Sequence, residues 1–192
     1  MRVFWRKGYE GASITDVTEA MGITRPSLYA AFGSKKQLFQ AVVMLYDAQH
    51  RSVLEEALAA PSACEVARLV LEGVATLVTD TRQNTPLGTL LLQGGLSCGD
   101  SDIPAQLAGQ RSHWEKAIRL RFVKAQAEGD LAPDADPVLL ARHIMAVLAG
   151  MAVLATEGVS RDGLLRLADL SVFAVAGATQ TARTMQAPAV AP

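Results

Sequence analysis

An all-α fold is what the sequence predicts, and three observations indicate it. Apolar residues recur at helical spacing, and no stretch alternates between apolar and polar residues for long enough to make a strand. Glycine, proline and small polar residues divide the chain into helix-sized segments. Half of the 192 residues are hydrophobic and 19 % are charged, which excludes an intrinsically disordered chain and a charged coiled-coil rod.

Cysteine usage and hydropathy predict a location inside the cell. The two cysteines, Cys64 and Cys98, are too few for the disulfide framework of a secreted scaffold. No charged-then-apolar leader opens the chain. The most apolar stretch, 137–155, carries an arginine and a histidine, and the longest uncharged run, 83–99, contains a proline and four glycines. Neither is a spanning helix, so we expect a cytoplasmic protein with no membrane partner.

The first two predicted helices are short. One covers 3–7 and is stopped by the glycine that follows it. The second begins after Ser13 and runs to Met21. Asp16 completes a variant of the capping box with Ser13, and Gly22 ends the helix.

A third short helix and a long one follow. Thr24 can cap the third helix, which has Pro26 in its first turn and reaches Phe32. Ser34 then begins a long helix over 35–58.

The rest of the chain predicts five further helices separated by turns rich in proline, glycine and small polar residues. They cover approximately 63–82, 88–96, 104–128, 137–158 and 162–185. The boundary between two parts of the chain falls inside the helix over 35–58, near Tyr46. We therefore predict one domain over 1–46 and a second over 47–192 that share this helix.

Residues 11–39 hold the motif with the clearest functional meaning. Two helices of about eight residues joined by a glycine-containing turn form the helix-turn-helix arrangement, whose second helix enters the DNA major groove. Arg25, Ser27 and Ala30 face outward near the start of that helix, and short side chains let its backbone approach a groove about 12 Å wide. Residues 1–46 hold six basic and three acidic residues, whereas the remainder holds 12 and 16. This distribution is consistent with a DNA-binding N-terminal domain.

The residues that carry a family resemblance are Lys7-Gly8-Tyr9, Ser13-Ile14-x-Asp16-Val17, Met21-Gly22-Ile23-Thr24, Ser27-Leu28-Tyr29 and Phe32-x-Ser34-Lys35-x-x-Leu38-Phe39. The segment resembles the N-terminal domain of TetR/AcrR-type transcriptional regulators, closely over 7–39 and beyond it in helix count and order. Such proteins usually have a longer first helix under the two reading helices, whereas seven residues precede Gly8 here. We interpret this as a start upstream of Met1, and otherwise expect a weakened DNA-binding domain.

The resemblance implies that the first domain binds double-stranded operator DNA. Ser13, Thr24 and Lys35 match positions that contact phosphates. Tyr29 matches an aromatic that touches the DNA backbone or a thymine methyl. The positions that face base edges are Arg25, Pro26, Ser27 and Ala30, with Arg25 the candidate for a guanine contact. Two alternatives stay open, because Ser13 and Thr24 would cap helices in any protein and Tyr29 could equally be a core residue.

The last two long helices carry more apolar surface than one domain can bury. Small residues beside large ones allow helices to approach closely, and the resemblance implies that these helices form a four-helix homodimer interface. The candidate interface residues are Ile144, Leu148, Met151, Leu167, Leu170 and Phe173. The alternative is that these side chains form the internal core of the domain.

A ligand cavity is expected near the break at 84–88 and the short helix after it. A short helix beside longer ones cannot fill the space between them evenly, which favours a pocket. The predicted apolar lining is Leu92, Leu96, Trp114, Ile118 and Phe122, and the predicted polar anchors are Thr89, Gln93 and His113. Trp114 and Phe122 could instead be plain core residues, and His113 an exposed helix histidine.

Together with the resemblance, these patterns imply a TetR-like one-component repressor that binds a palindromic operator as a homodimer and is released by a small, mostly apolar effector. The sequence carries no recognisable motif for catalysis or for binding a metal ion or a cofactor. We therefore expect that the protein is not an enzyme and has no cofactor. The alternative is a helical redox or metal sensor that uses Cys98, His113 or Cys64, or a ligand-binding protein whose DNA binding has weakened.

Overall fold

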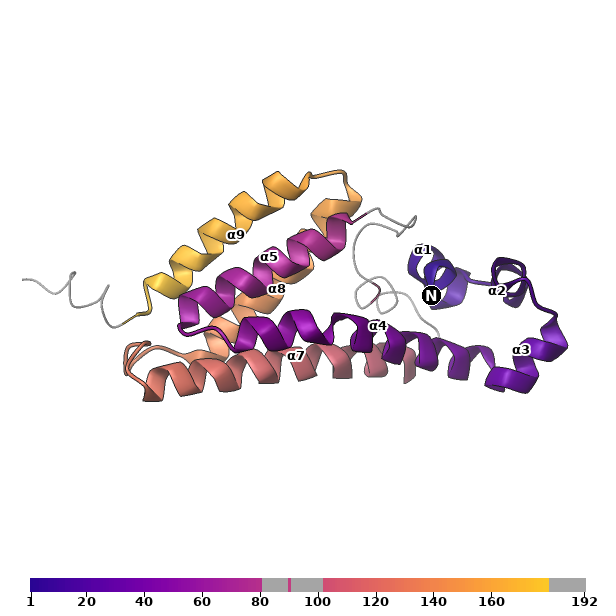
Figure 1. The fold of residues 1–192 in the computed structure, drawn as a ribbon, viewed down its shortest axis with the longest axis horizontal. Coiled ribbons are helices and arrows are strands. Elements are labelled where there is room, and N and C mark those ends of the chain that lie inside the picture. The colour runs from indigo at the N-terminus through magenta and orange to yellow at the C-terminus, as the bar shows by residue number, and fades with distance from the viewer. Residues whose placement is uncertain (81–89, 91–101, 180–192) are drawn as a thin grey trace, which may run out of the picture.

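The computed structural model describes residues 1–80, Leu90 and 102–179, and this part of the chain is built from helices joined by turns (Figure 1). The N-terminal helices are α1 (Arg2–Gly11), α2 (Ile14–Met21), α3 (Arg25–Phe32) and α4 (Lys35–Leu58). The others are α5 (Ala63–Thr79), α7 (Asp102–Ala127), α8 (Pro137–Thr156) and α9 (Arg161–Ala176). The predicted all-α fold class is confirmed.

Side-chain caps fix where these helices begin, as the sequence predicts. Ser13 forms a complete capping box with Asp16 at the start of α2. Thr24 and Ser34 accept backbone N–H bonds at the starts of α3 and α4, and Asp136 does so at the start of α8. Each cap satisfies N–H groups that a first helical turn leaves unpaired. The bounds of α4 are those that the sequence predicts.

Helix ends were less predictable than helix starts. Gly8 interrupts α1 with φ 67°, but the helix resumes and runs to Gly11. The predicted ends of the helices over 63–82 and 137–158 are wrong by two or three residues, because α5 and α8 end at Thr79 and Thr156. The predicted helix over 88–96, apart from Leu90, lies outside the described residues.

The predicted extension of the last helix to Met185 is wrong, because α9 ends at Ala176. The chain after α9 turns toward the segment that follows α7. There the N–H of Ala132 donates to the carbonyl oxygen of Ala178 at 2.9 Å, and Leu131 pairs with Thr179 in an isolated antiparallel bridge. These backbone bonds replace the helical ones that a longer α9 would form.

The N-terminal core is built around Phe4 and Trp5 of α1 and Phe39 and Tyr46 of α4. The ring centroids of Phe4 and Phe39 lie 5.2 Å apart and those of Trp5 and Tyr46 lie 5.1 Å apart, both edge to face. This geometry is the one that aromatic quadrupoles favour. Phe4 and Trp5 are almost fully buried, so the short α1 supplies two large side chains to this core.

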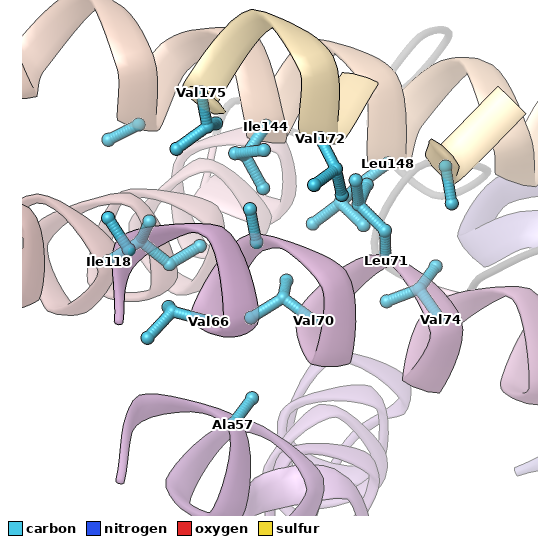
Figure 2. Close-up of a cluster of buried hydrophobic side chains, with 14 of the residues drawn as sticks. Ala57, Val66, Val70, Leu71, Val74, Ile118, Ile144, Leu148, Val172 and Val175 are labelled. Carbon is cyan, nitrogen blue, oxygen red and sulfur yellow. The ribbon is translucent and has the colours of Figure 1, made fainter. Parts of the chain in front are cut away.

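The C-terminal core is centred on α5, which packs against α4, α8 and α9. In Figure 2 the side chains of Leu71 on α5, Leu148 on α8 and Val172 on α9 point toward one another. Burying each such leucine or valine contributes roughly 1.5–3 kcal/mol. The stability of this part of the chain therefore rests on apolar contacts among helices far apart in the sequence.

One helix, α4, contributes to both cores. Tyr46 belongs to the N-terminal core and Leu54 to the C-terminal core. Leu90, Ile103 and Leu107 come from beyond residue 47 but are buried in the N-terminal core. The division of the chain into 1–46 and 47–192 stays a prediction. Residues from both halves pack in the N-terminal core, and α4 runs across the boundary.

The turn between α4 and α5 is held from α7. The Arg121 guanidinium donates from Nε to the carbonyl oxygen of Leu58 at 3.2 Å, and from Nη2 to those of Ala60 at 2.7 Å and Pro61 at 3.1 Å. The backbone N–H of Ala63 donates to the Asp130 carboxylate at 2.6 Å. These bonds satisfy carbonyl groups at and after the end of α4 and an N–H group at the start of α5, which have no partner within their helices.

Within the described ranges, α8 is long and apolar enough to cross a membrane by length and composition. A core helix passes the same test. α8 contacts α5, α7 and α9, and its residues Ala141, Ile144 and Met151 are buried in the C-terminal core. These buried residues account for part of its apolar composition, and 33 % of the apolar window is buried.

Candidate nucleic-acid interface

A tight turn sets α3 against α2. Gly22 has φ 66° and ψ 29°, a left-handed conformation that strains residues with a side chain. The N–H of Gly22 donates to the carbonyl oxygen of Glu19 at 3.2 Å, and that of Ile23 to Thr18 at 3.1 Å. Leu28 of α3 is fully buried in the N-terminal core. The pair is a helix-turn-helix, with α3 as its second helix.

The outward face of α3 carries the residues that the sequence predicts to read DNA. Arg25, Pro26, Ser27, Tyr29 and Ala30 are all exposed. The side of α3 opposite to them is anchored by the buried leucine between Ser27 and Tyr29. Tyr29 is 46 % exposed, so it lies at the surface and not in the core.

Sequence reasoning missed a contact between the two helices of the motif. Nη2 of Arg25, the first residue of α3, donates to Oγ1 of Thr15 on α2 at 2.5 Å. Thr15 is exposed like Arg25. The contact joins residues ten apart across a turn, and no sequence spacing signals such a bond.

Ser13 and Thr24 use their hydroxyl groups within the protein. Oγ of Ser13 accepts from the backbone N–H of Asp16 at 3.0 Å and donates to the Asp16 carboxylate at 2.8 Å. Oγ1 of Thr24 accepts from the backbone N–H of Ser27 at 3.3 Å. Both residues are helix caps, and a phosphate contact by either one stays a prediction.

Asp16 connects the start of α2 to α1. Lys7 Nζ lies 2.7 Å from its carboxylate, and the backbone N–H of Ser13 donates to the same carboxylate at 2.9 Å. The hydrogen bond from Lys7, followed by those from the backbone and hydroxyl of Ser13, holds the pKa of Asp16 far below its ordinary value. Asp16 is therefore ionised at neutral pH, and its negative charge interacts favourably with the positive end of the α2 dipole.

Lys35 stands at the first position of α4, where the sequence predicts a phosphate contact. Its Nζ lies 4.6 Å from the centre of the Tyr9 ring and 3.4 Å from the carbonyl oxygen of Glu10, to which it donates. The ammonium group is thus held between the end of α1 and the start of α4. A cation fixed beside a helix start is a suitable phosphate ligand.

Comparison with known proteins agrees with this geometry. The profile of the family described as "Bacterial regulatory proteins, tetR family" matches residues 1–42. The HTH-type transcriptional repressor ComR of Escherichia coli K12 is 30 % identical over 170 residues, which are 88 % of this chain and 81 % of ComR. The chain belongs to the TetR family. The predicted resemblance and the predicted role in transcription regulation are therefore confirmed, and the chain is a DNA-binding regulator and not an enzyme.

A solved structure of a TetR-family protein supports the same assignment, and a second solved structure shares the fold. The regulator CifR, solved as a cysteine mutant with 26-bp double-strand operator DNA, superposes with a TM-score of 0.83 at 37 % identity, over 90 % of this chain and 91 % of CifR. FadR from Bacillus subtilis, solved with stearoyl-CoA, superposes with a TM-score of 0.72 at 14 % identity, over 90 % of this chain and 91 % of FadR. The likeness to FadR shows the fold alone.

Three of the predicted dimer residues of this TetR-family chain are buried inside the protomer. Ile144, Leu148 and Met151 belong to the C-terminal core, so their assignment to the interface is wrong. Leu167 is partly buried against the same core. Leu170 and Phe173 are 67 % and 74 % exposed. Leu139 and Val153 of α8 are also exposed but are not among the predicted interface residues. We call the exposed side chains of Leu139, Val153, Leu170 and Phe173 the C-terminal apolar face.

The predicted pocket residues of this TetR-family chain divide into three groups. Trp114, Ile118 and Phe122 lie at helical spacing on the buried face of α7. His113 is exposed and points in a different direction from its neighbour Trp114, so its role as a polar anchor stays a prediction. Outside the described residues lie Thr89, Leu92, Gln93 and Leu96.

The alternative function, a redox or metal sensor, depends on Cys98, Cys64 and His113. Cys98 lies outside the described residues. Cys64 is half-buried, and burial raises the pKa of its thiol, which disfavours the reactive thiolate. Over residues 1–80 and 102–179, His, Cys, Asp and Glu side chains form no group of three or more that could hold a metal ion. No observation in the described part of the chain favours this alternative.

Proposed function

We propose that this TetR-family regulator is a repressor that binds a palindromic operator as a homodimer and is released by a small, mostly apolar effector. The observation that carries the proposal is the outward face of α3, where Arg25, Ser27 and Tyr29 are exposed next to a capped helix start. Repression is supported by the name of ComR, and operator binding by the CifR complex.

Each predicted DNA contact keeps a role in this proposal. Arg25 donates to a guanine edge in the major groove, and Tyr29 contacts the DNA backbone or a thymine methyl. Lys35 pairs with a phosphate. Pro26, Ser27 and Ala30 allow the start of α3 to approach the bases, while Ser13 and Thr24 present helix starts to phosphates.

The C-terminal apolar face supports the homodimer. Side chains as exposed as Leu170 and Phe173, on a helix that packs beside α8, mark a surface that a partner covers. A two-fold symmetric dimer presents two copies of α3 in opposite directions, which suits a palindrome with half-sites about one helical turn apart or slightly more.

The effector is proposed to bind beside α7. The buried side chains of Trp114, Ile118 and Phe122 are proposed to supply apolar lining together with Leu92 and Leu96 from the segment before α7, with Thr89 and Gln93 as polar anchors. A protein of the same fold, FadR, is solved with stearoyl-CoA, an amphipathic ligand that carries a long apolar acyl chain. Because α4 contributes to both cores, a ligand that prefers one tilt of α4 would change the separation of the two α3 helices. Such coupling is typically 1–3 kcal/mol.

The test is binding of the full chain to fluorescently labelled DNA from the region flanking its own gene, measured by anisotropy at several salt concentrations. We expect a complex at least about 10³-fold tighter than with random DNA of equal length, weakening linearly on a log–log salt plot. Equal affinity for the two DNAs over the whole salt range, with the flanking region scanned in overlapping fragments, would contradict the proposal.

A further inference from the structure

We propose that Thr15 is a positioning residue that holds Arg25 for base readout; the inference rests on the proposed DNA-binding role of Arg25. Arg25 is the first residue of α3, and its side chain crosses the turn to Thr15, the second residue of α2. The Nη2–Oγ1 distance is 2.5 Å. Both side chains are exposed, so the bond lies on the surface of the motif and not within its core.

The donor count of the guanidinium makes this arrangement compatible with base contact. Arginine carries five N–H donors in a planar fork, and Thr15 takes one of them. A bidentate contact with O6 and N7 of guanine needs two more. The bond to Thr15 fixes the plane of the fork before DNA arrives, so less side-chain freedom is lost on binding.

The neutral acceptor matters as much as its position. A carboxylate beside Arg25 would neutralise the guanidinium and compete with the acceptor atoms of guanine and phosphate. The carboxylate that follows Thr15 in the sequence, that of Asp16, is already bonded to Lys7 and Ser13. The hydroxyl of Thr15 therefore orients Arg25 without cancelling its charge.

The experiment selects binding sites from a random double-stranded DNA library with the wild-type chain and four variants. Arg25→Ala removes the reader, Thr15→Val removes the acceptor at nearly constant shape, and Thr15→Ser keeps the hydroxyl. Thr76→Val is a matched control, since it removes another Thr–Arg bond, from Arg161 Nε on α9 to Thr76 Oγ1 on α5 at 3.2 Å. Base preference at each position, affinity for random DNA and the salt slope are measured for all five proteins.

We expect Arg25→Ala to abolish preference at one position of each half-site. Thr15→Val should weaken preference at that same position about three- to tenfold, as expected for one side chain that must be ordered on binding. Its affinity for random DNA and its salt slope should not change, whereas removal of a phosphate-binding side chain lowers the slope by about one. Thr15→Ser and Thr76→Val should behave as wild type.

Three results would overturn the proposal. If Thr15→Val leaves base preference unchanged while Arg25→Ala relaxes it, Thr15 does not position Arg25, and Arg25 keeps its role. If Thr15→Val weakens specific and random DNA binding equally, Thr15 acts on the backbone or on folding. If Arg25→Ala itself leaves base preference intact, the base-reading role of Arg25 fails and Thr15 loses its function with it.

Discussion

Trp114 on α7 donates a hydrogen bond from its indole Nε1 to Oδ1 of Asp47 on α4, at 3.4 Å. The other oxygen of the Asp47 carboxylate lies 3.2 Å from Nη2 of Arg51. Asp47 directly follows Tyr46 of the N-terminal core, and Trp114 belongs to the C-terminal core. The indole is therefore placed where a change in the α4–α7 packing alters its surroundings.

Trp114 fluorescence should report effector binding. The sequence holds two tryptophans, so Trp5→Phe leaves Trp114 as the only indole. Compounds that release the operator should quench or shift the emission of this variant, because they enter beside α7. Asp47→Asn, which keeps an acceptor for Nε1, is the control for the hydrogen bond. Release of DNA with unchanged emission, and a normal response of Trp114→Ala, would place the pocket elsewhere.

Leu170→Glu should convert a dimer into a folded monomer. The leucine is 67 % exposed in the protomer, so the carboxylate is tolerated there but would be buried in the dimer interface, at a cost of several kcal/mol. Met44→Glu on α4, at a site 66 % exposed, is the matched control and should stay dimeric. Sedimentation velocity at micromolar concentration checks the result. A wild-type chain that is already monomeric there would refute the proposed interface.

Leu148→Glu should behave differently from Leu170→Glu. Leu148 is buried in the C-terminal core, so the substitution places an unpaired carboxylate among apolar side chains of α5 and α9. We expect the free energy of unfolding to fall by about 3 kcal/mol or more, so that the variant unfolds and does not simply dissociate into folded monomers. Urea unfolding followed by circular dichroism separates the two outcomes, and a stably folded Leu148→Glu monomer would contradict the assignment of Leu148 to the core.

Lys35→Ala should weaken binding to all DNA sequences. Removing one phosphate-binding ammonium group per protomer should lower affinity for specific and random DNA alike, and it should make the salt slope shallower by about one for each ammonium group removed. Lys116→Ala removes the same charge from the exposed face of α7 and should leave the slope unchanged. If both variants lower the slope equally, the effect is one of net charge and not of phosphate binding at the start of α4.

The capping box of α2 should make stability depend on pH. The folded-state pKa of Asp16 is depressed by Lys7 and Ser13, so its contribution is fully present above the unfolded pKa of about 3.9 and is lost as the pH falls below it. Asp16→Asn should therefore be less stable than wild type at pH 7, with the difference shrinking toward pH 3. Glu19→Gln, at the exposed end of the same helix, controls for loss of a negative charge. A difference that stays constant from pH 7 to pH 3 would show that ionised Asp16 is not the source.

Arg121→Ala should destabilise the junction of α4 and α5. The guanidinium serves three backbone carbonyls, and charged hydrogen bonds of this kind contribute about 1.5–3 kcal/mol. Arg121→Lys should not restore the loss, because an ammonium group cannot replace the planar fork. The neighbouring Arg119→Ala should change the free energy of unfolding by less than about 0.5 kcal/mol. Urea titration measures all three, and a neutral Arg121→Ala would contradict the clamp.

Local signals in the sequence were sufficient to predict most helix starts and the residues on the exposed face of α3. Ser13, Thr24 and Asp136 act on N–H groups two or three residues away, so their effect is readable from neighbours alone. The end of α9 was not readable in this way. It depends on the bond between Ala132 and Ala178, which only the folded chain brings together.

Three core residues of α8 were assigned to the predicted interface for a different physical reason. α8 carries apolar residues on its exposed side as well as on its buried side, so periodicity does not separate the face that packs on α5 from the face that is left exposed. Ile144 and Leu139 look alike in sequence, yet one is fully buried and the other 64 % exposed. The Thr15–Arg25 bond escaped prediction because it depends on the angle at which the Gly22 turn joins two helices.

The sharing of α4 by two cores limits how this protein can be divided. A cut before Tyr46 would remove one of the four central rings from the N-terminal core. An N-terminal piece that ended only after α4 would instead expose Leu54 and Ala57, which are buried in the C-terminal core, to water. Leu90, Ile103 and Leu107 would be missing from the N-terminal piece in either case. The DNA-reading end is thus not a transplantable module, and chimaeras that exchange specificity between relatives should keep α4 whole and graft only α2, the turn and α3.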